Sequence, residues 1–252
     1  MAKAFDTHIH LDLLPHPERQ LREARTAGID HWVVPGVSPQ GWPEIMRMAE
    51  TFPGVLAAPG VHPQAADRFS DEDLTTLRQL LASPAVVAIG EVGLDGTLDI
   101  PWSVQEEVFV HMIRLARELR KPLLIHTRKS IDRTLTLLER ENAAEVGGIV
   151  HAFSGSLETA HRIINAGFCL GIGGVITWSN ARRLPDVVRQ VSAEVLLLET
   201  DAPDLTPAPH RGQPNRPVYL TSIAAAVAQL RQQTVAEIIT RTTANARRIF
   251  QL

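Results

Sequence analysis

Eight short apolar segments of β type alternate along the chain with amphipathic segments of helical period, and this alternation constrains the fold more than any other feature. The expected strands cover residues 4–10, 31–37, 55–61, 86–92, 122–126, 148–152, 168–173 and 195–199. The expected helices cover residues 18–27, 40–51, 71–82, 104–120, 129–141, 157–166, 182–191, 219–232 and 235–250. Parallel strands joined by crossover helices produce this pattern, and eight repeats in 252 residues have the size of a (β/α)8 TIM barrel. We therefore predict an α/β protein with a single TIM-barrel domain over residues 1–252.

Local signals support several of these boundaries. Ser103 with Glu106 and Thr234 with Glu237 have the spacing of capping boxes, in which two side chains satisfy free backbone N–H groups at the start of a helix. Glycines stand where three helices should end, at Gly28, Gly54 and Gly167. The alternative architecture is an open doubly wound sheet. That fold usually has a Gly-x-Gly-x-x-Gly run after its first strand, and this chain has histidines there.

Those histidines, His8 and His10, stand two residues apart near the end of the first expected strand. Alternate residues of a strand point to the same face, so both imidazoles could bind one divalent ion. A His-x-His pair alone can equally be a surface strand or turn. Further polar residues end or follow the other expected strands: His62, Glu91, His126, His151 and Asp201. Because such barrels carry their chemistry at the carboxyl ends of the strands, all of these side chains should face one opening.

A metal cluster is the simplest explanation for this convergence, because buried histidines and carboxylates are costly to desolvate without a cation. Six of the residues are candidate metal ligands: His8, His10, Glu91, His126, His151 and Asp201. One tetrahedral ion takes four ligands, so we predict two divalent ions per chain, zinc or else magnesium or manganese. Glu91 is the candidate bridge between them.

The charge balance and cysteine content limit the partners and the compartment. The chain has 25 basic and 28 acidic residues, a net charge of −3, so any polyanion must be bound locally. Cys169 is the only cysteine, which fits a reducing compartment. No apolar run approaches the roughly 18 residues of a membrane helix. We expect a cytoplasmic protein with no membrane partner, and the sequence indicates no obligate protein partner.

Seven motifs, in family order and spanning almost the whole chain, resemble those of the TatD family of metal-dependent deoxyribonucleases in the amidohydrolase superfamily. They are Asp6-Thr7-His8-Ile9-His10-Leu11-Asp12, Pro59-Gly60-Val61-His62-Pro63, Ala88-Ile89-Gly90-Glu91-Val92-Gly93-Leu94-Asp95, Ile125-His126-Thr127-Arg128, His151-Ala152-Phe153-Ser154-Gly155-Ser156, Leu198-Glu199-Thr200-Asp201-Ala202-Pro203 and Asn215-Arg216-Pro217. The runs around Asp201 and Asn215 are most similar to the YjjV-like branch of that family.

The resemblance implies a metal-dependent hydrolase of phosphodiesters, often a 3′–5′ exonuclease on single strands. It implies that His8, His10, Glu91 and Asp201 hold one metal ion and that Glu91, His126 and His151 hold the other. Asp201 and Glu91 are then the catalytic residues, Asp201 as acceptor of a proton from the attacking water and Glu91 as the bridge. The substrate would be a single-stranded nucleic acid end or another small phosphodiester.

Two positions depart from the family pattern. Gly96-Thr97 follows Asp95 where many relatives have aromatic residues, and Met112 stands where a second glutamine often follows Gln105. The first departure bears on base stacking and substrate preference. The metal residues are intact.

Four residues are candidates for contacts with the substrate: His62, Arg128, Glu199 and Arg216. His62 would contact a phosphate, and its alternative role is to close the turn before Pro63. Arg128 is placed to bind a phosphate, or else is a solvated residue at a helix start. Glu199 would orient the ligand cluster, although a carboxylate paired with an arginine would have the same sequence context. Arg216 lies in the proline-rich segment 203–217, which is either a loop at the rim of the site or a connector.

Three classes of function are compatible with these residues. The first is a phosphodiesterase or nuclease. The second is a hydrolase of a carbonyl ester or amide, such as a D-aminoacyl-tRNA deacylase, because the same barrel and metals support that chemistry. The third is a non-catalytic metal-binding protein, which the intact set of six ligands disfavours.

Overall fold

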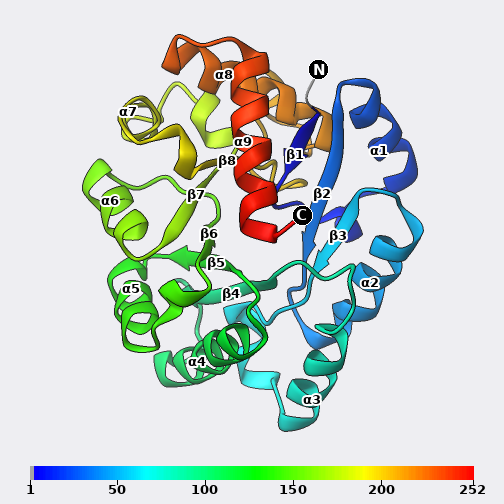
Figure 1. The fold of residues 1–252 in the computed structure, drawn as a ribbon, viewed down its shortest axis with the longest axis vertical. Helices are drawn as coiled ribbons and strands as arrows, with labels where there is room; N and C mark the ends of the chain where they lie inside the picture. The colour runs from blue at the N-terminus through cyan, green and yellow to red at the C-terminus, as the bar shows by residue number, and fades with distance from the viewer. Residues whose placement is uncertain (1–2) are drawn as a thin grey trace. The chain divides into compact units, whose positions relative to one another are not determined.

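The computed structural model describes residues 3–252, and its contacts divide the chain into two compact units. Unit 1 consists of Met1–Val34, His151–Ile164 and Cys169–Leu252, and unit 2 of Pro35–Val150 and Asn165–Phe168. Residues 3–252 contain eight β-strands and nine α-helices, in the order that the sequence predicts. Each unit is built of parallel strands with helices packed beside them (Figure 1).

Unit 1 carries all or most of four parallel strands: β1 (Ala4–Asp6), β2 (Ile29–Pro35), β7 (Phe168–Ile172) and β8 (Leu196–Leu198). β1 pairs with β2, and β7 pairs with β8. The backbone N–H of Thr7 donates to the carbonyl of Leu198 at 3.0 Å, which joins the end of β1 to β8. The helices of this unit are α1 (Pro17–Thr26), α6 (Leu157–Asn165), α7 (Leu184–Gln190), α8 (Leu220–Arg231) and α9 (Val235–Phe250).

The last helix, α9, covers the amino ends of β1 and β8, in front of which it lies in Figure 1. The hydroxyl of Thr243 donates to the carbonyl of Lys3 at 3.0 Å, and the amide of Asn245 donates to the carbonyl of Leu196 at 2.9 Å. Both acceptors precede or begin a strand. The loops at the carboxyl ends of these strands are therefore left to form the candidate site.

Unit 2 has the strands β3 (Val55–Ala58), β4 (Ile89–Asp95), β5 (Leu123–Arg128) and β6 (Gly148–Val150). β4, β5 and β6 pair in parallel, and a bridge between Ala57 and Val86 links β3 to the segment before β4. The helices are α2 (Trp42–Thr51), α3 (Asp71–Leu80), α4 (Trp102–Leu119) and α5 (Ile131–Arg140). All seven residues of β4 are buried, as expected for a strand that is covered on both faces.

The strands differ from the predicted ones mainly at their ends. β1 stops at Asp6, four residues before the predicted end, so His8 and His10 follow the strand rather than ending it. β4 begins at Ile89 and continues to Asp95, which makes Glu91 an interior residue of the strand. Apolar character alone misplaced both ends, because the regular strand pairing of β1 stops at Asp6 and that of β4 continues to Asp95.

The capping signals had mixed outcomes. Thr234 and Glu237 form both hydrogen bonds of a capping box at the start of α9, as predicted. The predicted box at Ser103 is wrong, because α4 already begins at Trp102 and Pro101 occupies the N-cap. The three predicted helix-ending glycines, Gly28, Gly54 and Gly167, have φ values of +92°, +80° and +87°. These angles favour glycine.

None of the helices in residues 3–252 has the length and apolar character needed to cross a membrane.

We predict that Thr234→Ala lowers the free energy of unfolding by about 1 kcal/mol, because it leaves N–H groups of the first turn of α9 without their cap. Urea denaturation of the purified protein measures this loss. Ser103→Ala is the matched control, and an equal loss in this variant would contradict the observed start of α4.

Candidate metal centre

The end of β1 is tied to the end of β8 by a buried carboxylate that sequence reasoning did not single out. Asp6 accepts hydrogen bonds from the backbone N–H of Thr200 at 2.9 Å and from its hydroxyl at 2.6 Å. Asp6 is wholly buried. Its period-two spacing with His8 and His10 is the signal that could have identified it.

This tie brings the first group of predicted ligands together. The backbone N–H of Asp201 donates to the carbonyl of His8, and that of His10 donates to the carbonyl of Ala202, both at 2.9 Å. As a result, Oδ1 of Asp201 lies 3.6 Å from Nε2 of His8 and 3.7 Å from Nε2 of His10. Asp201 has a φ of +57°, a region in which aspartate is enriched among non-glycine residues. These three side chains form the first candidate ion site.

His151 and Glu199 lie beside that group in unit 1. The ring of His151 stacks on that of His8, with centroids 4.0 Å apart. One carboxylate oxygen of Glu199, Oε1, accepts a hydrogen bond from the backbone N–H of Ala152 at 2.5 Å and lies 3.9 Å from Nδ1 of His151. Both contacts of this oxygen are therefore with the loop that carries His151. No arginine pairs with it among residues 3–252, which removes the alternative role considered from the sequence.

Burial dominates the electrostatics of this group. It raises the pKa of Asp6 to about 7, although the hydrogen bonds from Thr200 act against the rise. Burial also raises the pKa of Glu199 to about 8. The nearby His151 acts to lower this pKa, whereas the negative charge of Asp201 acts to raise it further. Carboxylates with such pKa values need neighbouring positive charge if they are to be ionised near neutral pH.

Unit 2 gathers the second group of predicted ligands around Glu91. Oε1 of Glu91 lies 2.7 Å from Nδ1 of His126 and 3.8 Å from Nε2 of His62. The rings of His62 and His126 meet edge to face, with centroids 4.3 Å apart. Nδ1 of His62 accepts a hydrogen bond from the backbone N–H of Gln64 at 3.1 Å. In neutral His62 with this hydrogen bond, the proton therefore sits on Nε2, which can act as a donor.

The Gly96-Thr97 departure has a structural explanation in unit 2. Thr97 donates from its backbone N–H and its hydroxyl to Oδ1 of Asp95, at 2.8 and 2.6 Å. Oδ2 of Asp95 lies 3.0 Å from Nε2 of His126. Burial raises the pKa of Asp95, but the hydrogen bonds from Thr97 and His126 outweigh it and hold that pKa below its usual value. A Cβ at Gly96 would lie 2.9 Å from the carbonyl oxygen of Lys129, so this loop has no room for an aromatic side chain there.

Gln105 holds the same loop from α4. Its side-chain oxygen accepts the backbone N–H of Asp95 at 2.9 Å, and its nitrogen donates to the carbonyl of Ile100 at 2.8 Å. Met112 is fully buried in the apolar face of α4 and makes no polar contribution. The first glutamine of the motif thus positions Asp95, the partner of His126.

Both donor sets suit divalent cations. Bonds of about 2.0–2.2 Å to nitrogen and oxygen place neighbouring ligand atoms of a tetrahedral ion about 3.4 Å apart. The separations of 3.6 and 3.7 Å among His8, His10 and Asp201 are close to that spacing. In unit 2 both ring nitrogens of His126 face carboxylate oxygens, whereas neutral imidazole has a single N–H.

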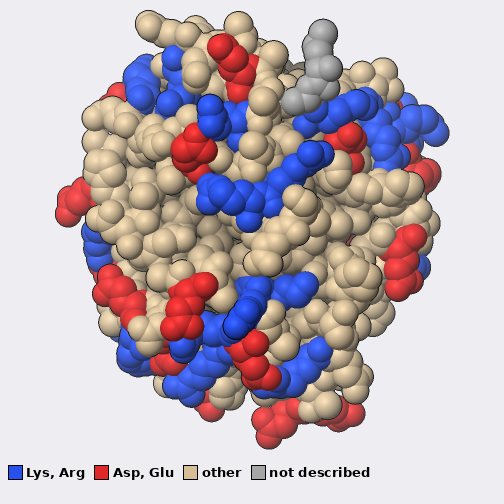
Figure 2. Space-filling view, viewed as in Figure 1, with Lys and Arg blue, Asp and Glu red and all other residues tan. Residues whose placement is uncertain are grey.

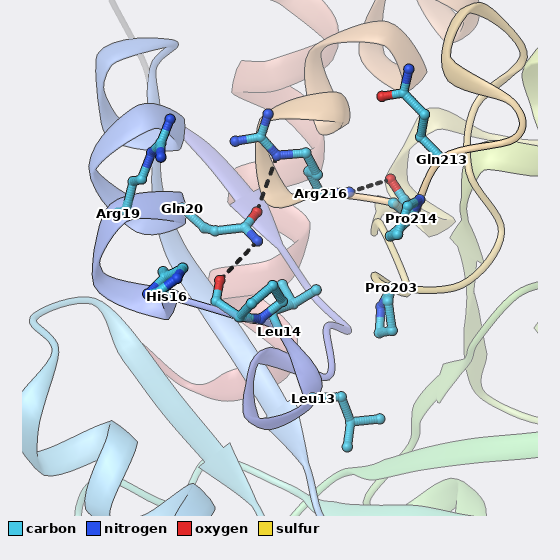
Figure 3. Close-up of a pocket in the computed structure, with 11 residues that line it drawn as sticks. Leu13, Leu14, His16, Arg19, Gln20, Pro203, Gln213, Pro214 and Arg216 are labelled. Atoms are coloured by element: carbon cyan, nitrogen blue, oxygen red, sulfur yellow. Dashed lines mark hydrogen bonds between the residues drawn. The ribbon is translucent and has the colours of Figure 1, made fainter.

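The segment after β8 forms a pocket with the segment after β1. Arg216 hydrogen-bonds to Gln20 at 3.3 Å and pairs with Glu23, so its side chain lies against α1 (Figure 3). Asn215 is fully buried and donates to the carbonyls of Thr200 and Asp204, both at 2.7 Å. The pocket has a volume of about 460 Å³. Segment 203–217 is thus anchored to the residues around Asp201, and its role as a rim of the site stays a prediction.

Arg128 is the most accessible of the four substrate candidates. It is the last residue of β5 and is exposed, whereas Glu199 is wholly buried. His62 is buried and follows β3 by four residues. The structure therefore places a donor, His62, inside the group around Glu91 and a cation, Arg128, at the surface of unit 2.

Comparison with known proteins extends this picture to the whole chain. The family model described as TatD related DNase matches residues 5–251. The uncharacterized metal-dependent hydrolase YabD of Bacillus subtilis (strain 168) is 39% identical over an alignment of 252 positions, which covers 98% of this chain and 99% of that protein. The uncharacterized metal-dependent hydrolase YjjV of Escherichia coli (strain K12) is 35% identical over 94% of each chain.

The solved structures agree. The crystal structure of YjjV, described as a TatD homolog from Escherichia coli K12, superposes with a TM-score of 0.94 at 33% identity and covers 100% of this chain and 99% of that one. A mutant organophosphorus hydrolase from Deinococcus radiodurans has a TM-score of 0.65 at 15% identity, over 99% of this chain and 93% of that one, which shows a similar fold. The chain has the α/β TIM-barrel fold that the sequence predicts.

We predict that His8→Ala and His126→Ala each lower the content of divalent metal in the purified protein, because each removes a nitrogen ligand from one donor set. Inductively coupled plasma mass spectrometry measures metal per chain. His161→Ala, on the exposed face of α6, is the control and should retain the full content. Unchanged metal content in both site variants would contradict the assignment.

Proposed function

Because the chain belongs to the TatD-related DNase family of metal-dependent hydrolases, we propose that it cleaves phosphodiester bonds at the 3′ end of single-stranded DNA, or of RNA. The main support is that two groups of side chains, His8 with His10 and Asp201, and His62 with Glu91 and His126, have donor atoms close enough together to hold an ion. Imidazole and carboxylate together favour zinc, manganese or magnesium over softer metals. A metal-activated hydrolase needs these donors and an acceptor for the proton of water.

We propose that one catalytic domain over residues 1–252 holds both sets in a single centre with two ions. His8, His10, Glu91 and Asp201 would hold one ion, and Glu91, His126 and His151 the other. In a TIM barrel all strands point their carboxyl ends to one face, and all six residues lie within a strand or shortly after one. Glu91, inside β4, is the proposed bridge.

Bound divalent ions would lower the pKa of a water molecule and stabilise charge on the phosphoryl oxygens. Asp201 accepts the proton of the attacking water, whose oxygen forms a bond to phosphorus as the bond to the 3′ oxygen of the remaining strand breaks. That 3′ oxygen receives a proton, and the terminal nucleotide leaves with the phosphate. His62 donates from Nε2 to a non-bridging oxygen, and its tautomer is set by the N–H of Gln64.

The remaining candidates take supporting roles. Arg128 and Arg216 neutralise phosphates of the strand, Arg128 as an exposed cation and Arg216 from the rim pocket that it lines. Glu199 accepts a hydrogen bond from the backbone N–H of Ala152 and thereby orients the neighbouring His151. We further propose a cytoplasmic location, which the free and buried thiol of Cys169 supports.

We predict that Glu91→Gln lowers kcat more than Glu199→Gln does. A bridging carboxylate gives charge to both ions, whereas a residue that only orients a ligand typically contributes about 10–100-fold. Steady-state kinetics on one oligonucleotide, with both variants folded by circular dichroism, makes the comparison. The reverse order would mean that Glu91 is not the bridge.

We also predict that linear single strands are shortened from the 3′ end, with blunt duplex and circular single strands resistant. The net charge of −3 offers no extended basic surface for two backbones, so binding should be weak. Its salt dependence should be shallow, with a slope of about −0.7 per phosphate neutralised. Gel analysis of end-labelled linear, duplex and circular substrates at two salt concentrations tests this prediction.

Equal cleavage of the circular strand would refute the exonuclease. Hydrolysis of an aminoacyl ester alone would favour the alternative function, a hydrolase of carbonyl esters or amides.

A further inference from the structure

The loop that follows β7 carries a tryptophan whose position is fixed by the fold. Trp178 is the first residue after the 3₁₀ turn Gly174–Thr177, and its indole N–H donates to the carbonyl of Thr206 at 2.9 Å. The guanidinium of Arg211 lies over the ring, 4.5 Å from its centroid. The side chain is half-buried, so part of the ring remains accessible.

Two exposed arginines follow this tryptophan within five residues. A hydrogen bond from the N–H of Ala181 to the carbonyl of Trp178 turns the chain, so that Arg182 and Arg183 come next. Trp178, both arginines and Ser154 line a cavity of about 340 Å³. This lies near the lower end of the range of about 300–1,000 Å³ for small-molecule sites.

Neither of these two arginines forms an ion pair with a carboxylate of residues 3–252. Several exposed arginines of the described residues pair with a carboxylate, as Arg78 does with Glu118 and Arg114 with Glu141. On the face drawn in Figure 2, acidic groups lie beside basic groups in several places. Within residues 3–252, neither Arg182 nor Arg183 has such a partner, although Asp186 on the next turn pairs with Arg189. Two exposed guanidinium groups that have no carboxylate partner, next to an aromatic ring, suit a ligand that has both negative charge and flat rings.

The cavity also lies at the edge of unit 1 where the candidate metal ligand Asp201 follows β8. β7 and β8 are parallel, so the loop after β7 leaves the sheet at the same edge as Asp201 after β8. Ser154 comes from the loop that begins with His151, one residue after β6. A strand whose end is at the metal ligands could therefore continue along this edge.

We propose that this cavity is a subsite for a nucleotide of the single strand that lies away from the reacting end. The base stacks on the indole ring of Trp178, which Arg211 holds from one face, and the adjacent phosphates contact Arg182 and Arg183. Stacking is tolerant of sequence, since every base has a flat face. The proposal rests on the proposed function and adds to it the segment of strand that supplies affinity without taking part in the reaction.

The test compares substrates that reach the subsite with one that does not. For Trp178→Ala and for the double variant Arg182→Ala/Arg183→Ala, we expect KM for a 12-nucleotide strand to rise about tenfold, with kcat unchanged. Hydrolysis of bis(p-nitrophenyl) phosphate, a small diester, should not change. Trp178→Phe keeps an aromatic face and should retain most of the affinity. The control Arg47→Ala/Arg78→Ala removes the same charge from α2 and α3 and should leave KM unchanged.

Binding measured without turnover separates this proposal from the proposed function. Fluorescence anisotropy of a phosphorothioate 12-mer with the metal-loaded enzyme should show weaker binding for both site variants and a shallower salt slope for the arginine variant. An abasic nucleotide at one fixed distance from the 3′ end should abolish the difference in affinity between wild type and Trp178→Ala.

Unchanged binding in both site variants would overturn the subsite, even if the enzyme cleaves DNA. Loss of activity on the small diester in Trp178→Ala would assign the residue to the reaction centre and overturn it too. If no diester is hydrolysed by wild type, the proposed function fails, and the anisotropy result alone decides the subsite.

Discussion

The candidate metal centre of unit 1 depends on the hydrogen bonds that the buried carboxylate of Asp6 accepts from Thr200. These bonds link the last residue of β1 to the residue that precedes Asp201, although 194 positions separate Asp6 from Thr200 in the chain. With the two ends held together, the next backbone bonds join His8 to Asp201 and His10 to Ala202. The ligands thus owe their spacing to main-chain geometry rather than to their own attraction. Such main-chain support holds the side chains of a candidate metal site in position.

Sequence reasoning identified the residue types of this centre because they stand at a regular place in a regular fold. Parallel strands alternate with helices, so the end of each apolar run marks one edge of the sheet, and polar residues at those ends are conspicuous. The same reasoning misplaced the end of β1 and the start of α4, since it followed apolar character and the Ser103–Glu106 spacing. Glu106 instead pairs with Arg133 of α5, a contact across 27 positions that no local pattern reveals.

Tertiary contacts also explain why the role of segment 203–217 stayed open in the sequence. Asn215 is not a surface residue of a flexible connector, because its side-chain amide satisfies two carbonyls beside the metal ligands while it is fully buried. Arg216 finds its acidic partner Glu23 in α1, 193 positions earlier. Buried polar groups of this kind must be hydrogen-bonded, but a sequence shows only that they are polar and not which distant group satisfies them.

The loop after β4 shows how a change at the rim can leave the centre intact. Here Gly96 packs against the main chain of Lys129, and Thr97 donates two hydrogen bonds to Asp95. These contacts make the loop hold the Asp95 carboxylate next to His126. On the proposed function, the side chain that stacks on a base comes from another loop, and the loop after β7 offers Trp178 together with Arg182 and Arg183. Because each loop is attached to its own strand end, such an exchange leaves the ligand-bearing strands unaltered. Differences between relatives in strand length or base preference should therefore follow these loops, while the metal chemistry follows the strand ends.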